Sequence, residues 1–310
     1  MKRCNLLIVC LLAAMSLLAQ SNTQFLPISV VVDEQVEPFP ATAKVQLQNK
    51  LTQLLTKNGV ASMDYLNQFF LTAFVVPQTK DVVSSAPMKI SETMDMTLYI
   101  ADYTNKVVFA STSLTIRGIG DTESKCYMSA LKNMPLNSPE IEKFVREGKE
   151  KIVAYYDYEA TNILKKAQFL ASTKQYEEAL SMIVTIPTLC NKYDEALRVG
   201  LDIYQQYLDN QCAINLAAAR QAWSAEQNST GAKKAGEYLA KIQPDAGCYD
   251  EAMALYQEIK GKVLDDWKFE MKQYQDSVDI EKSKVNAMRE VGVAFGKGQQ
   301  PTTTNIGFVR

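Results

Sequence analysis

The sequence contains no histidine among its 310 residues. Histidine is the side chain whose ordinary pKa lies closest to neutral pH, and it is the commonest protein ligand of zinc, copper and iron. Its absence excludes Ser-His-Asp and Cys-His catalysis and every metal site built on imidazole. Enzymes that use carboxylates, or calcium or magnesium held by oxygen ligands, remain compatible with this composition.

An excess of basic side chains is also missing. The chain has 33 lysines and arginines against 35 aspartates and glutamates, a net charge of -2 and a pI of about 5.5. Because a phosphate backbone is held mainly by clustered lysine and arginine, no nucleic-acid partner is expected. With 47% hydrophobic and 22% charged residues, the chain has a globular composition, and its length suits two ordinary domains.

The longest apolar run lies at the N-terminus. Met1-Lys2-Arg3 precedes an almost entirely apolar stretch from Cys4 to Leu18, after which the sequence turns polar. This is the pattern of a secretory signal peptide, which we assign to residues 1–20. The run is too short for a comfortable transmembrane helix, and no second candidate span follows.

A lipid anchor is not expected at this leader. Leu7-Ile8-Val9-Cys10 is a poor lipobox, because Val9 stands where glycine or alanine is wanted. We therefore predict an exported protein, periplasmic or associated with the outer membrane, without a transmembrane span.

Residues 21–137 alternate between strand and helix patterns. Met94, Met96, Leu98 and Ile100 alternate with polar residues, as in a half-buried strand. The expected strands are residues 27–32, 69–76, 88–103 and 107–117, and the expected helices are 40–58 and 122–133. The order β-α-β-β-β-α predicts an α+β fold, with a mixed, largely antiparallel sheet and helices on one face.

A family resemblance rests on the end of this region. Arg117-Gly118-Ile119-Gly120, then Asp121-Thr122-Glu123-Ser124 and a helix of small residues through Ala130, resembles the closing segment of small envelope α/β domains. These occur in curli-type secretion lipoproteins, penicillin-binding-protein activator lipoproteins and flagellar outer-membrane accessory proteins. The resemblance implies a binding or assembly role and transfers no catalytic residue.

Gly118 and Gly120 also invite comparison with a phosphate-binding loop. The third glycine of a dinucleotide motif is missing, because Glu123 stands in its place. We interpret the pair as a tight turn that needs positive φ and ends the strand.

Residues 138–292 contain an internal repeat. Tyr193-Asp194-Glu195-Ala196 returns 56 residues later as Tyr249-Asp250-Glu251-Ala252. We predict three helices per unit, present about twice, which resembles tetratricopeptide-type helical repeats. The expected helices include 193–208, 212–226 and 233–242. The paired carboxylates have the residue types of acid–base catalysis, but acids are also favoured in the first turn of a helix, and we adopt the structural interpretation.

Four cysteines follow the leader: Cys126, Cys190, Cys212 and Cys248. An even number in an exported protein indicates disulfides, with buried free thiols as the alternative. Cys212 opens one helix of a predicted antiparallel hairpin and Cys248 lies just beyond its partner, so we predict that these two pair. Cys190 and Cys212 flank a helix of about 16 residues, and a separation of roughly 25 Å forbids their pairing. Cys126 and Cys190 stay unassigned.

The helical pattern continues from Tyr249 to about Arg289. Its apolar residues follow steps of three and four, and they are Leu264, Trp267, Met271, Tyr274, Val278, Val285 and Met288. We predict one long C-terminal helix whose seam packs along the array, with self-association or partner binding as the alternative. Residues 293–310 are expected to be a flexible tail.

The favoured function is that of an exported, non-enzymatic interaction or assembly protein of the cell envelope, with protein partners. The alternative is a module that binds glycan or cell wall, and a carboxylate-dependent hydrolase is third. No catalytic residue, cofactor or metal is assigned.

Overall fold

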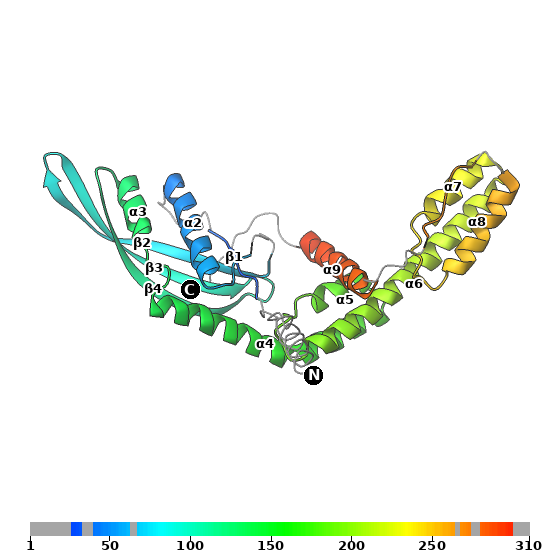
Figure 1. Cartoon of the computed structure of the whole chain (residues 1–310), viewed down its shortest axis with the longest axis horizontal. Helices are drawn as coiled ribbons and strands as arrows, with labels where there is room; N and C mark the ends of the chain where they lie inside the picture. Colours follow the sequence, from blue (N-terminus) through cyan, green and yellow to red (C-terminus); the bar gives the residue numbers. More distant parts are fainter. Residues whose placement is uncertain (1–25, 33–39, 63–66, 264–266, 274–279, 300–310) are drawn as a thin grey trace, which may run out of the picture.

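The computed structural model describes residues 26–32, 40–62, 67–263, 267–273 and 280–299, so the predicted signal peptide lies outside the described residues. The molecule is elongated and bent, with the α/β half towards one end and helices α6, α7 and α8 towards the other (Figure 1). No helix among the described ranges is both long and apolar enough to cross a membrane.

The α/β half contains a four-stranded sheet in the order β1-β2-β3-β4. β1 runs parallel to β2, and the other neighbours are antiparallel. The strands are β1 (Ser29–Val30), β2 (Phe69–Ser85), β3 (Met88–Asp102) and β4 (Val107–Gly120). The predicted mixed, largely antiparallel sheet is confirmed.

One face of the sheet is covered by helices. Met94, Met96, Leu98 and Ile100 of β3 are buried in one core with the apolar side chains of α2 (Ala41–Lys57) and α3 (Glu123–Lys132). Helix α4 (Pro139–Ser172) reaches the same side chains, since a Cβ atom at Gly148 would lie 2.7 Å from Ile100 Cδ1. The alternation of β3 therefore identified the covered face correctly.

The hairpin of β2 and β3 is longer than the sequence indicated. β2 was expected to end at Val76, but it stays paired with β3 as far as Ser85. Pro77, Lys80 and Asp81 break the apolar pattern of a strand without breaking its ladder. The part of the hairpin from Val76 to Lys89 projects beyond the helices in Figure 1, and we call it the β-arm.

The helical half contains fewer breaks than predicted. Its helices are α4, α5 (Tyr176–Ile183), α6 (Tyr193–Ala225), α7 (Ser229–Leu239), α8 (Tyr249–Val263) and α9 (Ile280–Gln299). The predicted separate helices 193–208 and 212–226 are one continuous helix, α6, of 33 residues. The sequence between them contains no glycine or proline to stop a helix.

Two hydrophobic cores result, and α6 contributes to both. Ala196 and Ile203 of α6 belong to the core that includes the sheet, α4 and α5. Leu216 and Trp223 of the same helix belong to a second core with α7 and α8. The connection between the two cores is therefore helix and not loop.

The predicted long C-terminal helix is wrong. α8 ends at Val263, residues 267–273 are described without helix, and α9 begins at Ile280. Leu264, Tyr274 and Val278 of the predicted seam lie outside the described residues. The flexible tail was also placed too early, because α9 runs past residue 293 to Gln299.

Candidate functional site

Helix α3 lies unusually close to β4 at the base of the β-arm. A Cβ atom at Gly118 would lie 1.9 Å from the backbone oxygen of Cys126, and one at Gly120 would lie 2.8 Å from the nitrogen of Cys126. Both glycines are inside β4, and neither has positive φ. The predicted strand-ending turn is thus wrong, and these glycines are required by the close approach of the helix.

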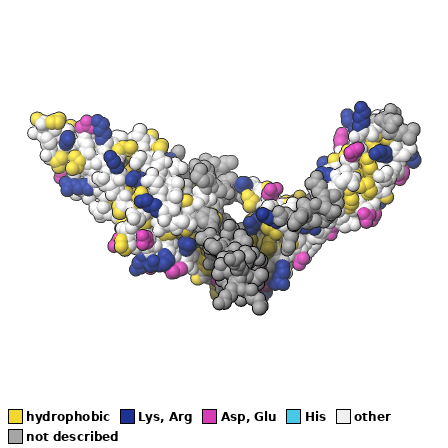
Figure 2. All heavy atoms as spheres, viewed as in Figure 1, with side chains coloured by type: hydrophobic (Ala, Val, Ile, Leu, Met, Phe, Trp, Pro, Cys, Tyr) yellow, Lys and Arg dark blue, Asp and Glu magenta, His cyan; other side chains and the backbone are white. Residues whose placement is uncertain are grey.

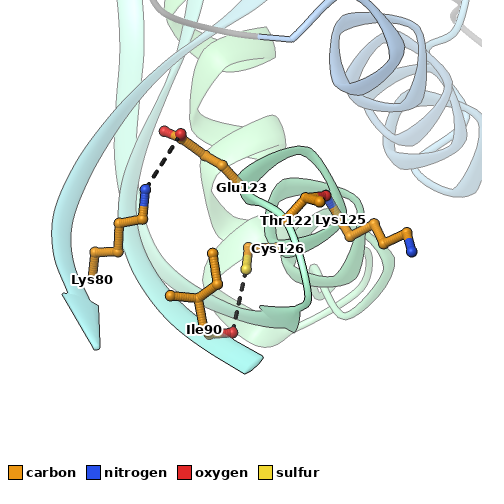
Figure 3. A network of polar contacts seen from close by, with 6 residues as sticks. All are labelled: Lys80, Ile90, Thr122, Glu123, Lys125 and Cys126. Atoms are coloured by element: carbon orange, nitrogen blue, oxygen red, sulfur yellow. Dashed lines mark hydrogen bonds and ion pairs between the residues drawn. The ribbon is translucent and has the colours of Figure 1, made fainter. Parts of the chain in front are cut away.

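A small polar network joins this helix to the arm (Figure 3). The Cys126 thiol donates to the Ile90 carbonyl at 3.3 Å, and Lys80 Nζ lies 3.4 Å from Glu123 Oε2. Thr122 caps α3 by accepting from the backbone N–H of Lys125 at 3.3 Å. The network therefore anchors the N-terminal turn of α3 against the arm.

Glu92 is buried beside this network. It pairs in register with Lys80 and Gly118, is 2% exposed, and its Oε2 has no hydrogen-bond partner among the described residues. Burial raises the pKa of its carboxyl group, and the charge of Glu123 adds to that rise, while Lys80 opposes it. An unpaired carboxylate here costs folding free energy whenever it is ionised.

Replacing Glu92 by glutamine is expected to stabilise the protein at pH 7 by about 1 kcal/mol. The raised pKa means that the folded protein holds the protonated form of Glu92 more strongly than the unfolded chain does. Glu92 therefore does not destabilise the fold at a pH below its unfolded pKa, and it destabilises the fold increasingly as pH rises through the folded pKa. The gain from glutamine should therefore shrink at pH 4. Urea unfolding at both pH values measures it, and Glu237→Gln on the exposed side of α7 is the control. An equal gain at both pH values would contradict this account.

Cys126 and Cys190, which the sequence left unassigned, are free and buried. Burial, followed by the charge of Glu92, raises the pKa of the Cys126 thiol. Burial and then the charge of Asp157 raise the pKa of Cys190 to about 12. Since the thiolate is the reactive form, neither thiol is arranged as a nucleophile.

Large apolar side chains are exposed on several of the described elements, among them the β-arm and α4. Val82, Val83 and Met88 lie at the tip of the β-arm, where hydrophobic atoms are visible in Figure 2. On α4, Tyr158 is 77% and Phe169 is 65% exposed. These two are 11 positions apart and lie on one side of the helix, because three turns bring the face round again.

A buried carboxylate ties the sheet to α4. Asp102 accepts from the backbone N–H of Thr104 at 2.7 Å and from the backbone N–H and side-chain amide of Asn105, each at 3.0 Å. The Tyr156 hydroxyl of α4 donates at 2.5 Å to Oδ2, the carboxylate oxygen that also accepts from the Asn105 amide. The turn between β3 and β4 is therefore organised by Asp102, which accepts hydrogen bonds from the two residues that follow Tyr103.

Alkaline pH is expected to destabilise the protein through its buried tyrosines. Burial raises the pKa of Tyr127 to about 12, and burial followed by the charge of Asp102 raises that of Tyr156 further. In the folded protein these phenols stay neutral, whereas in the unfolded chain they ionise near pH 10. Their contribution to the free energy of unfolding is therefore constant below about pH 10 and decreases above it. Urea unfolding should show that ionisation of Tyr127 in the unfolded chain lowers the free energy of unfolding by about 1 kcal/mol at pH 11. Tyr127→Phe should lose less stability than the natural chain between pH 9 and 11, and equal losses would contradict the assignment.

The two turns that carry the repeated motif are built alike. Asp157 of α4 accepts from the backbone N–H of Asn191, and Asp209 of α6 accepts from that of Gly247, both at 2.7 Å. Asn191 and Gly247 are 56 positions apart, whereas the two aspartates are 52 apart. Because these spacings differ, the two aspartates do not stand at equivalent positions of the sequence repeat.

The paired carboxylates of this motif lie at the surface. Asp194, Glu195, Asp250 and Glu251 are exposed in the first turns of α6 and α8. Glu195 forms an ion pair with Lys192 at 3.3 Å, and Glu251 with Arg220 at 2.8 Å. Their placement follows the helix dipole.

Cys212 and Cys248 form a disulfide, with their Cα atoms 6.0 Å apart. This is the pair predicted from the antiparallel hairpin. It links α6 to the turn that precedes α8 within the second core.

The other residues of the predicted C-terminal seam are divided between the two hydrophobic cores. Trp267 and Met271 are buried against α7 and α8 in the second core. Met288 of α9 is buried in the first core, where a Cβ atom at Gly200 would lie 2.6 Å from its sulfur, and Val285 is half-buried. They do not form the continuous stripe that was predicted.

Comparisons with known proteins give little further guidance. No protein-family model matches the sequence, and no curated protein matches it. A minor lipoprotein from Acinetobacter baumannii is similar at 16% identity with a TM-score of 0.25, over 40% of this chain and 91% of that one. A protein from Caulobacter crescentus described as a lipoprotein is similar at 14% identity with a TM-score of 0.22, over 40% of this chain and 83% of that one. These values are too low to carry an argument about this chain.

Proposed function

We propose that this chain is an exported, non-enzymatic interaction and assembly protein of the cell envelope. In this proposal the β-arm docks one protein partner, and the helical half presents its repeated helices to another. The observation that carries the proposal is the presence of exposed apolar side chains at two separate places, the tip of the β-arm and the Tyr158–Phe169 side of α4. Apolar side chains that lie together outside a core, as at the tip of the β-arm, mark contact surfaces.

Export is supported by the leader pattern and by the disulfide. The N-terminal basic and apolar segments have the order of a signal peptide. A disulfide such as Cys212–Cys248 persists in an oxidising compartment and is rare in the cytosol.

A non-enzymatic role is supported by the state of the groups that chemistry would need. Asp102 is occupied by the β3–β4 turn and by Tyr156, and both free thiols are buried with raised pKa values. The repeated carboxylates are solvated at helix starts. Each group has a structural explanation.

A glycan-binding role is the second candidate, and the face of the sheet opposite α2 and α3 favours it. There the half-buried rings of Phe74 and Tyr99 are in edge contact at 6.4 Å, and the hydroxyls of Thr97 and Ser113 lie 3.1 Å apart. Aromatic faces and hydroxyls together are suited to sugar rings.

A pull-down of the tagged full chain from cross-linked cell envelopes tests the proposal, with the eluate analysed for proteins and glycans. We expect reproducible protein partners. Val82→Asp with Met88→Asp should reduce recovery of one partner by about tenfold, and Tyr158→Ala with Phe169→Ala should do so for another, as loss of central apolar contacts does. Val45→Asp, on an equally exposed residue of α2, is the matched control.

Two outcomes would contradict the proposal. Bound glycan without protein would favour the glycan-binding candidate. Partners recovered equally with every variant would remove both surfaces from the proposal.

A further inference from the structure

Residues 267–273 cross α7 and α8 without forming a helix or strand of their own. Trp267 and Met271 are buried there, and Phe269 packs beside them. Every second side chain thus points into the second core, which is the pattern of an extended peptide lying on a surface.

The helices contribute a shaped receiving surface, which we call the α7–α8 face and define by Gly236, Tyr249 and Tyr256. The Tyr256 ring lies 5.5 Å from the ring of Trp267 and 5.9 Å from that of Phe269. A Cβ atom at Gly236 would lie 3.1 Å from the Trp267 ring and 3.4 Å from that of Phe269. The glycine therefore leaves room for the two aromatic rings.

Side chains, not backbone pairing, hold the segment in place. Among the described residues, no backbone hydrogen bond joins residues 267–273 to the helices. The Tyr249 hydroxyl donates to the Lys272 carbonyl. Held in this way, the segment can separate from the helices without breaking a backbone ladder.

A charge lies beside the aromatic contacts. Lys260 of α8 donates to the Tyr256 hydroxyl at 3.1 Å. That hydrogen bond, with a further contribution from the charge of Glu270, raises the pKa of the lysine. Glu270 is exposed between Phe269 and Met271.

We propose that the α7–α8 face is a docking surface for an extended peptide of a partner protein, and that residues 267–273 occupy it in the unbound chain. The segment itself shows the chemistry that the face accepts: two aromatic side chains two positions apart, then an acidic residue, then a methionine or similar aliphatic side chain. This inference rests on the proposed function and names the kind of partner.

Occupation by a tethered segment makes binding competitive. A short tether gives its segment an effective concentration of about millimolar, so a partner peptide must displace it. The face is thereby shielded until a better-matched peptide arrives.

The test uses a fluorescent peptide with the sequence of residues 264–275 and the full chain. Trp267→Ser, Phe269→Ser and Met271→Ser together empty the face, and anisotropy then measures binding. The emptied variant should bind the peptide at least about 10-fold more tightly than the natural chain, because its competitor is gone. A peptide of the same composition in scrambled order is the control and should not bind.

A second variant guards against misfolding. Gly236→Leu, added to the emptied variant, places a side chain where the Trp267 ring lies and should abolish peptide binding. Far-UV circular dichroism and an intact Cys212–Cys248 bond establish that each variant is folded.

The proposal is overturned if the folded, emptied variant does not bind, or binds no more tightly than the natural chain. It is also overturned if light scattering shows a dimer and the segment cross-links to the face of the second copy. If the peptide fails while the envelope pull-down still recovers partners, this face is excluded and the interaction function stands.

Discussion

Replacing both Cys212 and Cys248 by alanine is expected to destabilise the distal helices by about 4 kcal/mol. The bond closes a loop with a sequence separation of 36, and opening it restores the freedom of that loop in the unfolded chain. The effect should be local, because α7, α8 and the distal part of α6 form a core separate from that of the sheet. Calorimetry should show a new transition at lower temperature, while the transition of the first core stays in place.

Reduction of the natural chain provides the control. Dithiothreitol should reproduce the low-temperature transition in the natural chain and should have no further effect on the double variant. A natural chain that melts identically with and without reductant would show that the disulfide does not support this core.

Asp102→Ala is expected to lower the free energy of unfolding by about 3 to 5 kcal/mol. The substitution removes the acceptor of two backbone N–H groups in the β3–β4 turn and leaves the Tyr156 hydroxyl buried without its carboxylate. Because Tyr156 belongs to α4, the attachment of that helix to the sheet should weaken with the turn. Urea unfolding followed by circular dichroism measures the loss.

Tyr156→Phe separates the two parts of this effect. It removes the hydroxyl and leaves the turn, so it should cost about 1 to 2 kcal/mol. A double-mutant cycle of Asp102→Ala with Tyr156→Phe should show coupling of more than about 0.5 kcal/mol. Strictly additive losses would mean that the carboxylate and the hydroxyl act independently.

Several features of the fold could be predicted from the sequence. The alternation in β3 identified the buried face of the sheet. The Cys212–Cys248 pair followed from the antiparallel arrangement of two helices, because that arrangement places their ends side by side. In each of these cases the signal was local or depended on one pair of neighbouring helices.

Features that depend on distant packing could not be predicted in this way. The β-arm is exposed on both sides, so nothing in the arm required the apolar alternation of a strand. Trp267 and Met271 have helical spacing, yet α7 and α8 hold them as part of an extended segment. Glu92 became a buried carboxylate only because Gly118 lets α3 lie directly on β4.

Helix α6 also determines how the two ends of the molecule move together. It leaves the first core near Ile203 and enters the second near Leu208 without a loop between them. It therefore acts as a lever whose outer arm, from Leu208 to Ala225, is about 25 Å long at 1.5 Å per residue. A tilt of about 10° where α6 leaves the first core would carry the far end through about 4 Å. A force on the distal helices therefore acts through α6 as a torque on the first core, which contains α4 and the sheet.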